Sequence, residues 1–244
     1  MSSDISSSWR GVVGLVKPTY RPGSLEEMIR LLPEGIGVIP LFLGIKTGEE
    51  KERLNALESV KEKIAELAKL KVDLIFPQGA GLFMLRGYKE AGEIVRSLEE
   101  KHGIPILTSA MTLVESFNAL GIKRIVIVGY IKGEMNQKYE QYLNDAGFEV
   151  LGMDAISVPF AEVGRLSYRE VYAFSKNLYL KYNRAQGICL LGAGWRVLEA
   201  VPLLEQDLQV PVVHQTTAHV WAIQKRFHVR QPVKGCGRLL EEMP

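Results

Sequence analysis

The stretch Leu74-Ile-Phe-Pro-Gln-Gly-Ala-Gly-Leu-Phe83 has a counterpart later in the chain, Gly187-Ile-Cys-Leu-Leu-Gly-Ala-Gly-Trp195. In both copies an apolar run ends in a Gly-Ala-Gly triplet, and the triplets start 113 residues apart (79 to 192). A helical pattern containing Leu-Glu follows each triplet, and then a second apolar run that contains a proline. The prolines are 106 residues apart (105 to 211). The matched order of strand, turn, helix and strand indicates an internal repeat.

Short β-branched runs alternate with helical patterns along the rest of the chain. The runs are mostly continuously apolar, which is typical of parallel strands covered on both faces. The clearest helical pattern places Leu54, Leu57, Val60, Ile64 and Leu67 on one face. Alternation of this kind predicts parallel sheets joined by right-handed crossovers. The predicted strands are Gly11–Val16, Gly37–Leu43, Val72–Pro77, Ile104–Thr108, Arg124–Gly129, Glu149–Met153, Gly187–Leu191 and Val210–His214.

The repeat predicts an α/β fold of two pseudo-symmetric domains, each built on a parallel sheet. The first half comprises residues 10–111 together with 217–244, and the second comprises residues 112–216. In open α/β sheets the ligand binds beyond the carboxyl ends of the strands. Both Gly-Ala-Gly turns lie at such ends, so we expect one small-molecule site in the cleft between the halves. Ser24 and Glu27 predict a capping box at the start of an early helix.

Composition excludes several classes of function. The chain has 244 residues, with 30 basic and 28 acidic residues mixed along it, so no basic stripe suggests a nucleic-acid partner. No run approaches the ~20 apolar residues that span a bilayer, and the polar N-terminus has no signal pattern, so we expect a cytoplasmic protein. Cys189 and Cys236 show no metal spacing, and no His/Asp/Glu cluster does either. We expect neither a metal nor a cofactor; a homo-oligomer is compatible with the sequence.

The two glycine turns are the predicted binding elements. Glycine lets the backbone approach a ligand closely, and N–H groups at the start of a following helix suit a carboxylate or a developing oxyanion. The alternative is that both are simply tight strand-to-helix turns. Neither triplet fits a dinucleotide or triphosphate motif, so the expected partner is a small carboxylate. The predicted binding residues on and beside the turns are Gln78, Gly79, Ala80, Gly81, Gly192, Ala193 and Gly194.

These residues resemble the aspartate/glutamate racemase superfamily, and within it the branch containing arylmalonate decarboxylase and maleate cis-trans isomerase. The likeness is strongest in residues 79–87, 121–131 and 190–221, and in the tail from Lys234 to Glu241. It implies a cofactor-free enzyme that stabilises a carbanion or enediolate beside a carboxylate, with hydrogen-bond donors from both turns. It also implies that Pro18 belongs to a loop at the site and that Tyr130 helps to bind the substrate carboxylate.

The sequence departs from that family at the two cysteines that its members commonly carry, one on each turn. The matching positions are Gly79 and Gly192. Thiol-dependent racemisation and thiol-dependent maleate isomerisation are therefore disfavoured. Cys189 lies three residues before Gly192 and points to the opposite face of its strand, so we predict a buried core residue.

His214 and Tyr130 are the predicted catalytic side chains. His214 closes a strand near the cleft and can exchange a proton near neutral pH, although a structural histidine is an equal alternative. Lys17 could pair with a substrate carboxylate, but a solvated lysine is the commoner outcome. His219 is expected at the surface or at a helix cap. Three leucines could form an apolar wall of the site, and core positions explain them equally well: Leu41, Leu43 and Leu82.

Together these features predict a cofactor-independent lyase or isomerase that acts on a small carboxylic acid through an enediolate. Its most specific form is decarboxylation of a malonate-like acid. The alternative, which the missing cysteines favour, is a non-catalytic carboxylate-binding protein or an inactive paralogue. We favour the enzyme because the glycine turns and the polar strand ends are retained, although a fold resemblance alone does not assign a reaction.

Overall fold

Two parallel β-sheets form the framework of the protein, which is described here from a computed structural model for residues 7–244. The first sheet has the strand order β2-β1-β3 and the second has the order β5-β4-β6-β7, with every pair parallel. The predicted fold class is confirmed. The strands are β1 Gly11–Lys17, β2 Ile36–Phe42, β3 Leu74–Pro77, β4 Arg124–Gly129, β5 Glu149–Ala155, β6 Gly187–Leu190 and β7 Val212–His214.

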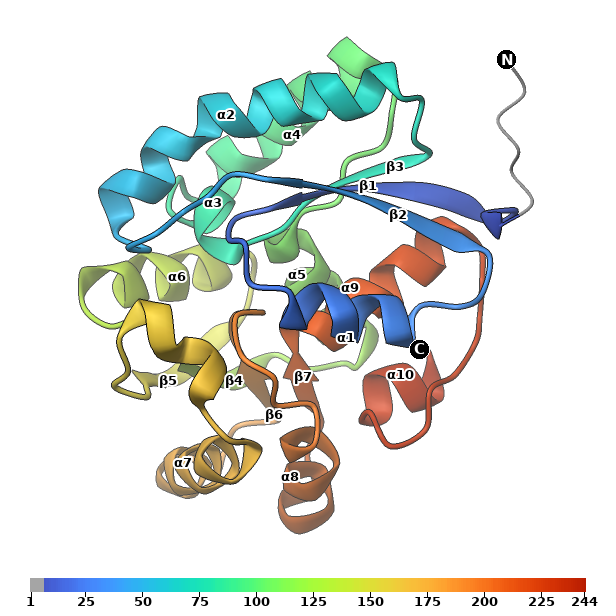
Figure 1. Ribbon diagram of the computed structural model, residues 1–244. Helices are drawn as coiled ribbons and strands as arrows, with labels where there is room; N and C mark the ends of the chain where they lie inside the picture. The colour runs from blue at the N-terminus through green and yellow to red at the C-terminus, as the bar shows by residue number, and fades with distance from the viewer. Residues whose placement is uncertain (1–6) are drawn as a thin grey trace.

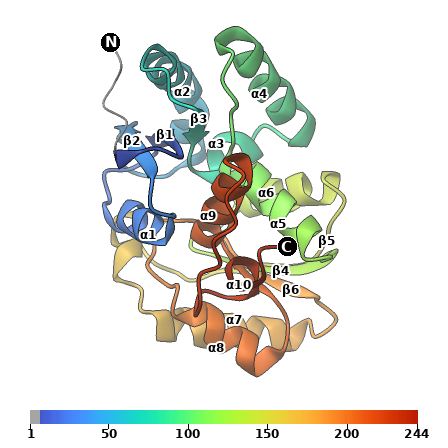
Figure 2. The same cartoon turned by 90° about the vertical axis from the view of Figure 1, so that its right-hand side faces the viewer.

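Helices cover the outer faces of both sheets and fill the space between them. The helices are α1 Gly23–Leu31, α2 Glu50–Lys69, α3 Ala80–Met84, α4 Tyr88–His102, α5 Ser109–Ala119, α6 Glu134–Asp145, the 3₁₀ helix η2 Phe160–Arg165, α7 Tyr168–Lys181, α8 Ala200–Leu208, α9 Gln215–Arg226 and α10 Arg238–Glu242. Figure 1 shows α2 and α4 beyond the first sheet, α7 and α8 beyond the second, and α1, α5 and α9 between the two. Helices α5 and α9 pack against each other, and Figure 2 shows this central layer from the side.

The internal repeat extends to individual hydrogen bonds. A carboxylate oxygen of Glu99 accepts the backbone N–H of Ile106 at 2.7 Å, and one of Glu205 accepts that of Val212 at 2.8 Å. Each pair links a helix that follows a Gly-Ala-Gly turn to the residue directly after Pro105 or Pro211. Corresponding residues are 106 positions apart (99 to 205, 106 to 212). The two halves therefore share specific hydrogen bonds as well as a sequence pattern.

The predicted strand Ile104–Thr108 is wrong. This segment lies beside β3, where the N–H of Ile75 donates to the carbonyl of Pro105 and the N–H of Leu107 donates to the carbonyl of Ile75. Only one residue pair forms a bridge, between Ile75 and Ile106, so the segment is too short to count as a strand. Proline has no N–H to extend the ladder.

The predicted capping box of Ser24 and Glu27 is also wrong. Helix α1 begins at Gly23, and no side chain caps its first turn. The Ser24 hydroxyl instead accepts a hydrogen bond from Nζ of Lys17 at 2.7 Å, and Glu27 faces Arg196 at 3.8 Å. The tertiary partners of the two side chains have taken the place of the local bond.

The expectation that a helix follows each triplet holds only for the first. The short helix α3 begins at Ala80, directly after Gly79, but α8 begins only at Ala200, well beyond Gly194. Between Gly194 and Ala200, Trp195 and Val197 are completely buried, and this packing stands in place of a first helical turn.

One apolar core joins the halves. Its buried side chains include Leu15 and Phe76 of the first sheet and Ile127 and Val213 of the second. The domain boundaries stay a prediction, since helices α5 and α9 pack together across them. Among residues 7–244, no helix combines the length and apolarity that a transmembrane span requires.

Candidate functional site

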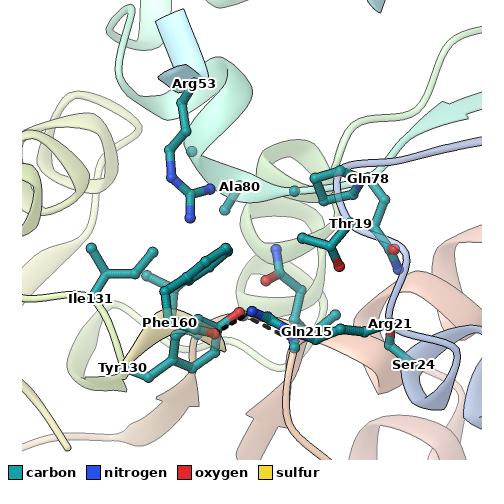
Figure 3. A pocket seen from close by; sticks show the side chains of 18 of the residues that line it. Thr19, Arg21, Ser24, Arg53, Gln78, Ala80, Tyr130, Ile131, Phe160 and Gln215 are labelled. Carbon is teal, nitrogen blue, oxygen red and sulfur yellow. Dashed lines mark hydrogen bonds between the residues drawn. The ribbon is translucent and has the colours of Figure 1, made fainter. Parts of the chain in front are cut away.

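A cavity lies where the two sheets point their carboxyl ends at each other. It contains about 650 Å³ of space free of atoms, a volume that includes its opening to solvent. Figure 3 shows side chains converging on it from both halves. The lining residues are Lys17, Pro18, Thr19, Arg21, Ser24, Arg53, Gln78, Gly79, Ala80, Gly81, Gly129, Tyr130, Ile131, Tyr139, Met153, Phe160, Leu191, Gly192, Ala193, Gly194 and Gln215.

The two glycine turns both line the cavity and have nearly the same φ angle at their first residue. The φ angle is +106° at Gly79 and +107° at Gly192, a region that residues with a side chain rarely adopt. The N–H of Gly79 donates to the hydroxyl of Ser109 at 2.8 Å, which fixes the first turn. The sequence-predicted pairing of the two turns across one site is thus present.

Tyr130 follows β4 and occupies the space over the second turn. Its hydroxyl accepts the N–H of Gly194 at 3.1 Å, and its ring packs edge-on against Trp195 with 5.0 Å between the ring centroids. A Cβ atom placed on Gly192 would stand 2.5 Å from both Cε1 and Oη of this tyrosine. Burial raises the pKa of Tyr130, while Arg53, the Gly194 N–H and Arg21 act in the opposite direction. The phenol is therefore protonated at neutral pH.

Three cationic side chains line the cavity: Lys17, Arg21 and Arg53. Lys17 is only 1% exposed, so the expectation of a solvated lysine is wrong. Burial and the neighbouring Arg21 lower the pKa of Lys17 to about 8. Burial and Arg53 lower the pKa of Arg21, although Tyr130 opposes this shift. Like charges gathered in a partly desolvated space favour the binding of an anion.

Phe160 of η2 brings both arginines together. Its backbone carbonyl accepts a hydrogen bond from Nη2 of Arg21. The guanidinium carbon of Arg21 lies 4.3 Å from the centroid of its ring, and that of Arg53 lies 5.4 Å away. Figure 3 shows the two side chains reaching Phe160 from different sides. Cation–π contacts of this kind hold guanidinium groups in place without neutralising them.

His214 lies in the core and is not among the cavity-lining residues of the described chain. Burial lowers the pKa of His214 to about 4, with the backbone of Gly192 opposing the shift, so the imidazole is neutral at pH 7. His219 is also completely buried, which corrects the expectation of a surface or capping position. It lies edge-on to Phe76, with 4.7 Å between ring centroids, and 3.4 Å from the amide nitrogen of Gln78.

The two cysteines lie outside the cavity lining. Cys189 is completely buried, as predicted, and burial raises the pKa of its thiol. Cys236 is half-buried in the tail before α10, and the two thiols are not joined in a disulfide. No group of three or more His, Cys, Asp or Glu side chains within residues 7–244 has the geometry of a metal site.

Every predicted site residue except His214 lines the cavity, although their roles stay predictions. Several cavity residues were not predicted from the sequence, above all Arg21, Arg53, Tyr139 and Phe160. Arg53 left a signal: it extends the buried stripe of α2 one turn before Leu57. A charged residue at a core position of an amphipathic helix is unusual. The leucines expected in an apolar wall, Leu41, Leu43 and Leu82, do not line the cavity.

Comparison with known proteins supports the architecture and the resemblance drawn from the repeat. The model of the family described as arylmalonate decarboxylase matches residues 13–240. The arylmalonate decarboxylase of Bordetella bronchiseptica is 23% identical over 94% of this chain and 96% of its own length. The maleate isomerase of Geobacillus stearothermophilus is 28% identical over 93% and 96%, respectively.

Solved structures of related enzymes share the fold. The maleate isomerase Iso of Pseudomonas putida S16 superposes with a TM-score of 0.86 at 20% identity, covering 96% of this chain and 99% of that one. The maleate cis-trans isomerase of Nocardia farcinica gives a TM-score of 0.88 at 21% identity, covering 95% and 98%. With a family match that extends from β1 to α10, the chain belongs to the arylmalonate decarboxylase family, whose named relatives here are a decarboxylase and maleate isomerases.

Proposed function

We propose that the chain is a cofactor-independent lyase or isomerase that acts on a small carboxylic acid through an enediolate, most specifically a decarboxylase of a malonate-like acid. The named relatives are enzymes for small acids. The cavity supplies cations and hydrogen-bond donors, and no aspartate or glutamate lines it among the described residues. An enediolate carries more negative charge on its oxygens than the acid it comes from, so such an environment stabilises it selectively.

The observation that carries this proposal is the position of Tyr130. Its hydroxyl fills the space into which a side chain at Gly192 would project, at 2.5 Å from the ideal Cβ position. The resemblance places the family's second cysteine at that position. A protonated phenol thus lies beside the position where the cysteine side chain would begin, and it can serve as a general acid.

The reaction needs no other redox or group-transfer partner. The bond between the α-carbon and one carboxylate breaks, CO₂ leaves, and the bonding electron pair passes into the remaining carboxylate to give the enediolate. Tyr130 then donates its hydroxyl proton to the α-carbon. The phenolate left behind is stabilised by Arg53, by the N–H of Gly194 and by Arg21, which oppose the burial-raised pKa, and it recovers a proton from water.

Lys17 and Arg21 are the proposed partners of the negative charge that moves into the remaining carboxylate. Nζ of Lys17 donates to Ser24 at 2.7 Å and retains two further N–H donors. The Nη1 atom of Arg21 stands 3.1 Å from the ideal Cβ position of Gly194, beside the Tyr130 hydroxyl. Both groups can bind the carboxylate that becomes the enediolate. The role predicted for His214 is a separate proposal, which its own variant tests.

Proton NMR in D₂O with the purified chain tests the proposed function. The panel comprises alkyl- and arylmalonates, maleate and both enantiomers of aspartate and glutamate. We expect loss of a carboxylate with one deuterium entering at the α-carbon. Exchange of an α-proton without CO₂ loss would move the assignment to isomerisation or racemisation. Saturable binding without any turnover would support the alternative, a carboxylate-binding protein without catalysis.

A further inference from the structure

Arg53, Tyr139 and Gly81 form one corner of the cavity, where α2, α3 and α6 meet. Arg53 is 5% exposed and Tyr139 is 1% exposed. A Cβ atom on Gly81 would stand 2.5 Å from Oη of Tyr139 and 3.0 Å from Nη1 of Arg53. The absence of a side chain at Gly81 therefore makes room for a guanidinium and a phenol over the first turn. This corner mirrors the second turn, where Gly194 faces Tyr130 and Arg21.

The polar groups of this corner are held in place but not satisfied. Nε of Arg53 donates to the carbonyl of Gly48 at 2.7 Å, which orients the guanidinium plane. The hydroxyl of Tyr139 is buried and has no hydrogen-bond partner within the described chain. Burial raises the pKa of Tyr139 to about 12, so this hydroxyl keeps its proton and is available as a donor. A buried donor without an acceptor is costly unless a ligand supplies one.

The charge of Arg53 also lacks a counter-ion. Within residues 7–244, Arg53 forms no salt bridge, and neither do Lys17 and Arg21. The carboxylate that acts on Tyr139 is that of Glu50, which is paired with Lys138. A buried, unpaired cation destabilises the unliganded protein, and an anion that enters the cavity relieves this cost.

This corner is unsuited to the carboxylate that leaves as CO₂. A buried guanidinium would stabilise that group in the ground state and slow its departure. The carboxylate that becomes the enediolate has its own proposed partners, Lys17 and Arg21. This corner is therefore suited to an acidic group of the substrate that does not react.

We propose that Arg53 and Tyr139 bind a carboxylate that the substrate keeps throughout the reaction, so that the substrate is a malonate-like acid whose α-substituent carries a further carboxylate. The reaction in this statement rests on the proposed function. Arg53 can bind a carboxylate through two parallel N–H groups, and Tyr139 adds a third donor. The Phe160 ring beside Arg53 limits the reach of the guanidinium and so fixes the length of the α-substituent.

Binding of the two reaction products separates this subsite from the chemistry. Decarboxylation of methylmalonate would give propionate, and decarboxylation of ethane-1,1,2-tricarboxylate would give succinate. We expect the wild-type chain to bind succinate at least about tenfold more tightly than propionate in calorimetry at equal ionic strength. Arg53→Gln removes this preference and Tyr139→Phe reduces it several-fold. Tyr142→Phe, on the same helix and outside the cavity lining, leaves it unchanged.

Equal affinities for the two acids, or a preference that survives Arg53→Gln, would overturn the subsite. If Arg53→Gln does not fold, Tyr139→Phe decides, because it removes one hydroxyl only. Turnover of methylmalonate and of the tricarboxylate is measured separately. A succinate preference without any turnover contradicts the proposed function and leaves the subsite standing. Turnover of methylmalonate without the preference contradicts the subsite alone.

Discussion

At the scale of single residues, the proposed function depends on a phenol that acts in place of a thiol. The Tyr130 hydroxyl lies against the second turn and accepts the N–H of Gly194 at 3.1 Å. General acids contribute about 10²- to 10⁴-fold to a rate. We therefore expect Tyr130→Phe to lower kcat at least about 100-fold while the fold is kept, as measured by NMR turnover and circular dichroism. The matched variant His214→Gln, which changes a residue outside the cavity lining, should lower kcat far less; the reverse order would assign the proton to His214.

The space around Gly192 gives a second prediction at this scale. A side chain there meets the ring of Tyr130 at 2.5 Å and also requires a φ of +107°. Gly192→Cys should therefore cost about 2 kcal/mol or more in the free energy of unfolding. In urea unfolding, Tyr130→Ala should be less harmful in the Gly192→Cys background than in the wild type, because it removes the clash. Strictly additive effects of the two substitutions would show that the clash does not exist.

At the scale of secondary-structure elements, two equivalent glutamates link a helix to the extended segment that follows it. Glu205 is buried and accepts the N–H groups of Val212 at 2.8 Å and Arg238 at 2.9 Å, whereas Glu99 accepts only that of Ile106. Glu205→Ala leaves two backbone donors without partners and should cost about 3 kcal/mol, against about 1.5 kcal/mol for Glu99→Ala. Urea unfolding of the two variants measures both costs. Equal costs would contradict the view that Glu205 also anchors α10.

The elements that carry the repeat could be predicted from the sequence because their signals are local. In both copies the apolar run before Gly-Ala-Gly forms a buried strand, and the first glycine of the turn has a positive φ. The segment Ile104–Thr108 shows the limit of this reasoning, because strand assignment depends on a partner that the run itself does not encode. The same holds for Ser24, whose hydroxyl bonds to Lys17 from another element.

The site was predictable only in its backbone part. The turn residues follow directly from the repeat, but Arg53, Tyr139 and Phe160 reach the cavity from α2, α6 and η2, which only the tertiary fold brings together. The sequence pattern placed Lys17 at a strand end but could not show its burial, which depends on tertiary packing and places Nζ against Ser24 of α1. His214 was placed correctly on its strand, yet its side chain turns into the core.

At the scale of the whole molecule, the buried histidine makes stability depend on pH. The pKa of His214 is about 4 in the folded chain against 6.5 when unfolded, so the unfolded state binds more protons between these values. The stabilisation is complete above pH 6.5 and is lost as the pH falls towards 4, by about 3 kcal/mol. Glu27 acts with the opposite sign, because burial raises its pKa to about 7.

Chemical unfolding at pH values from 4 to 7 measures this dependence. The free energy of unfolding should fall more steeply with acid in the wild type than in His214→Gln. His219 is buried as well and contributes in the same direction, so the difference between the two chains, and not the wild-type slope alone, reports His214. Parallel curves for the two chains would show that His214 is not responsible.

The central claim is that this chain performs carbanion chemistry on a small acid without a thiol, and a chain without cysteine tests it most directly. The measurement is decarboxylation of a malonate-like acid in D₂O by the Cys189→Ala, Cys236→Ser double variant, beside the wild type and Tyr130→Phe. The account predicts that the double variant keeps the wild-type rate within a few-fold, incorporates deuterium at the α-carbon and depends on Tyr130. Loss of turnover in a double variant that is still folded, with turnover retained in Tyr130→Phe, would contradict it.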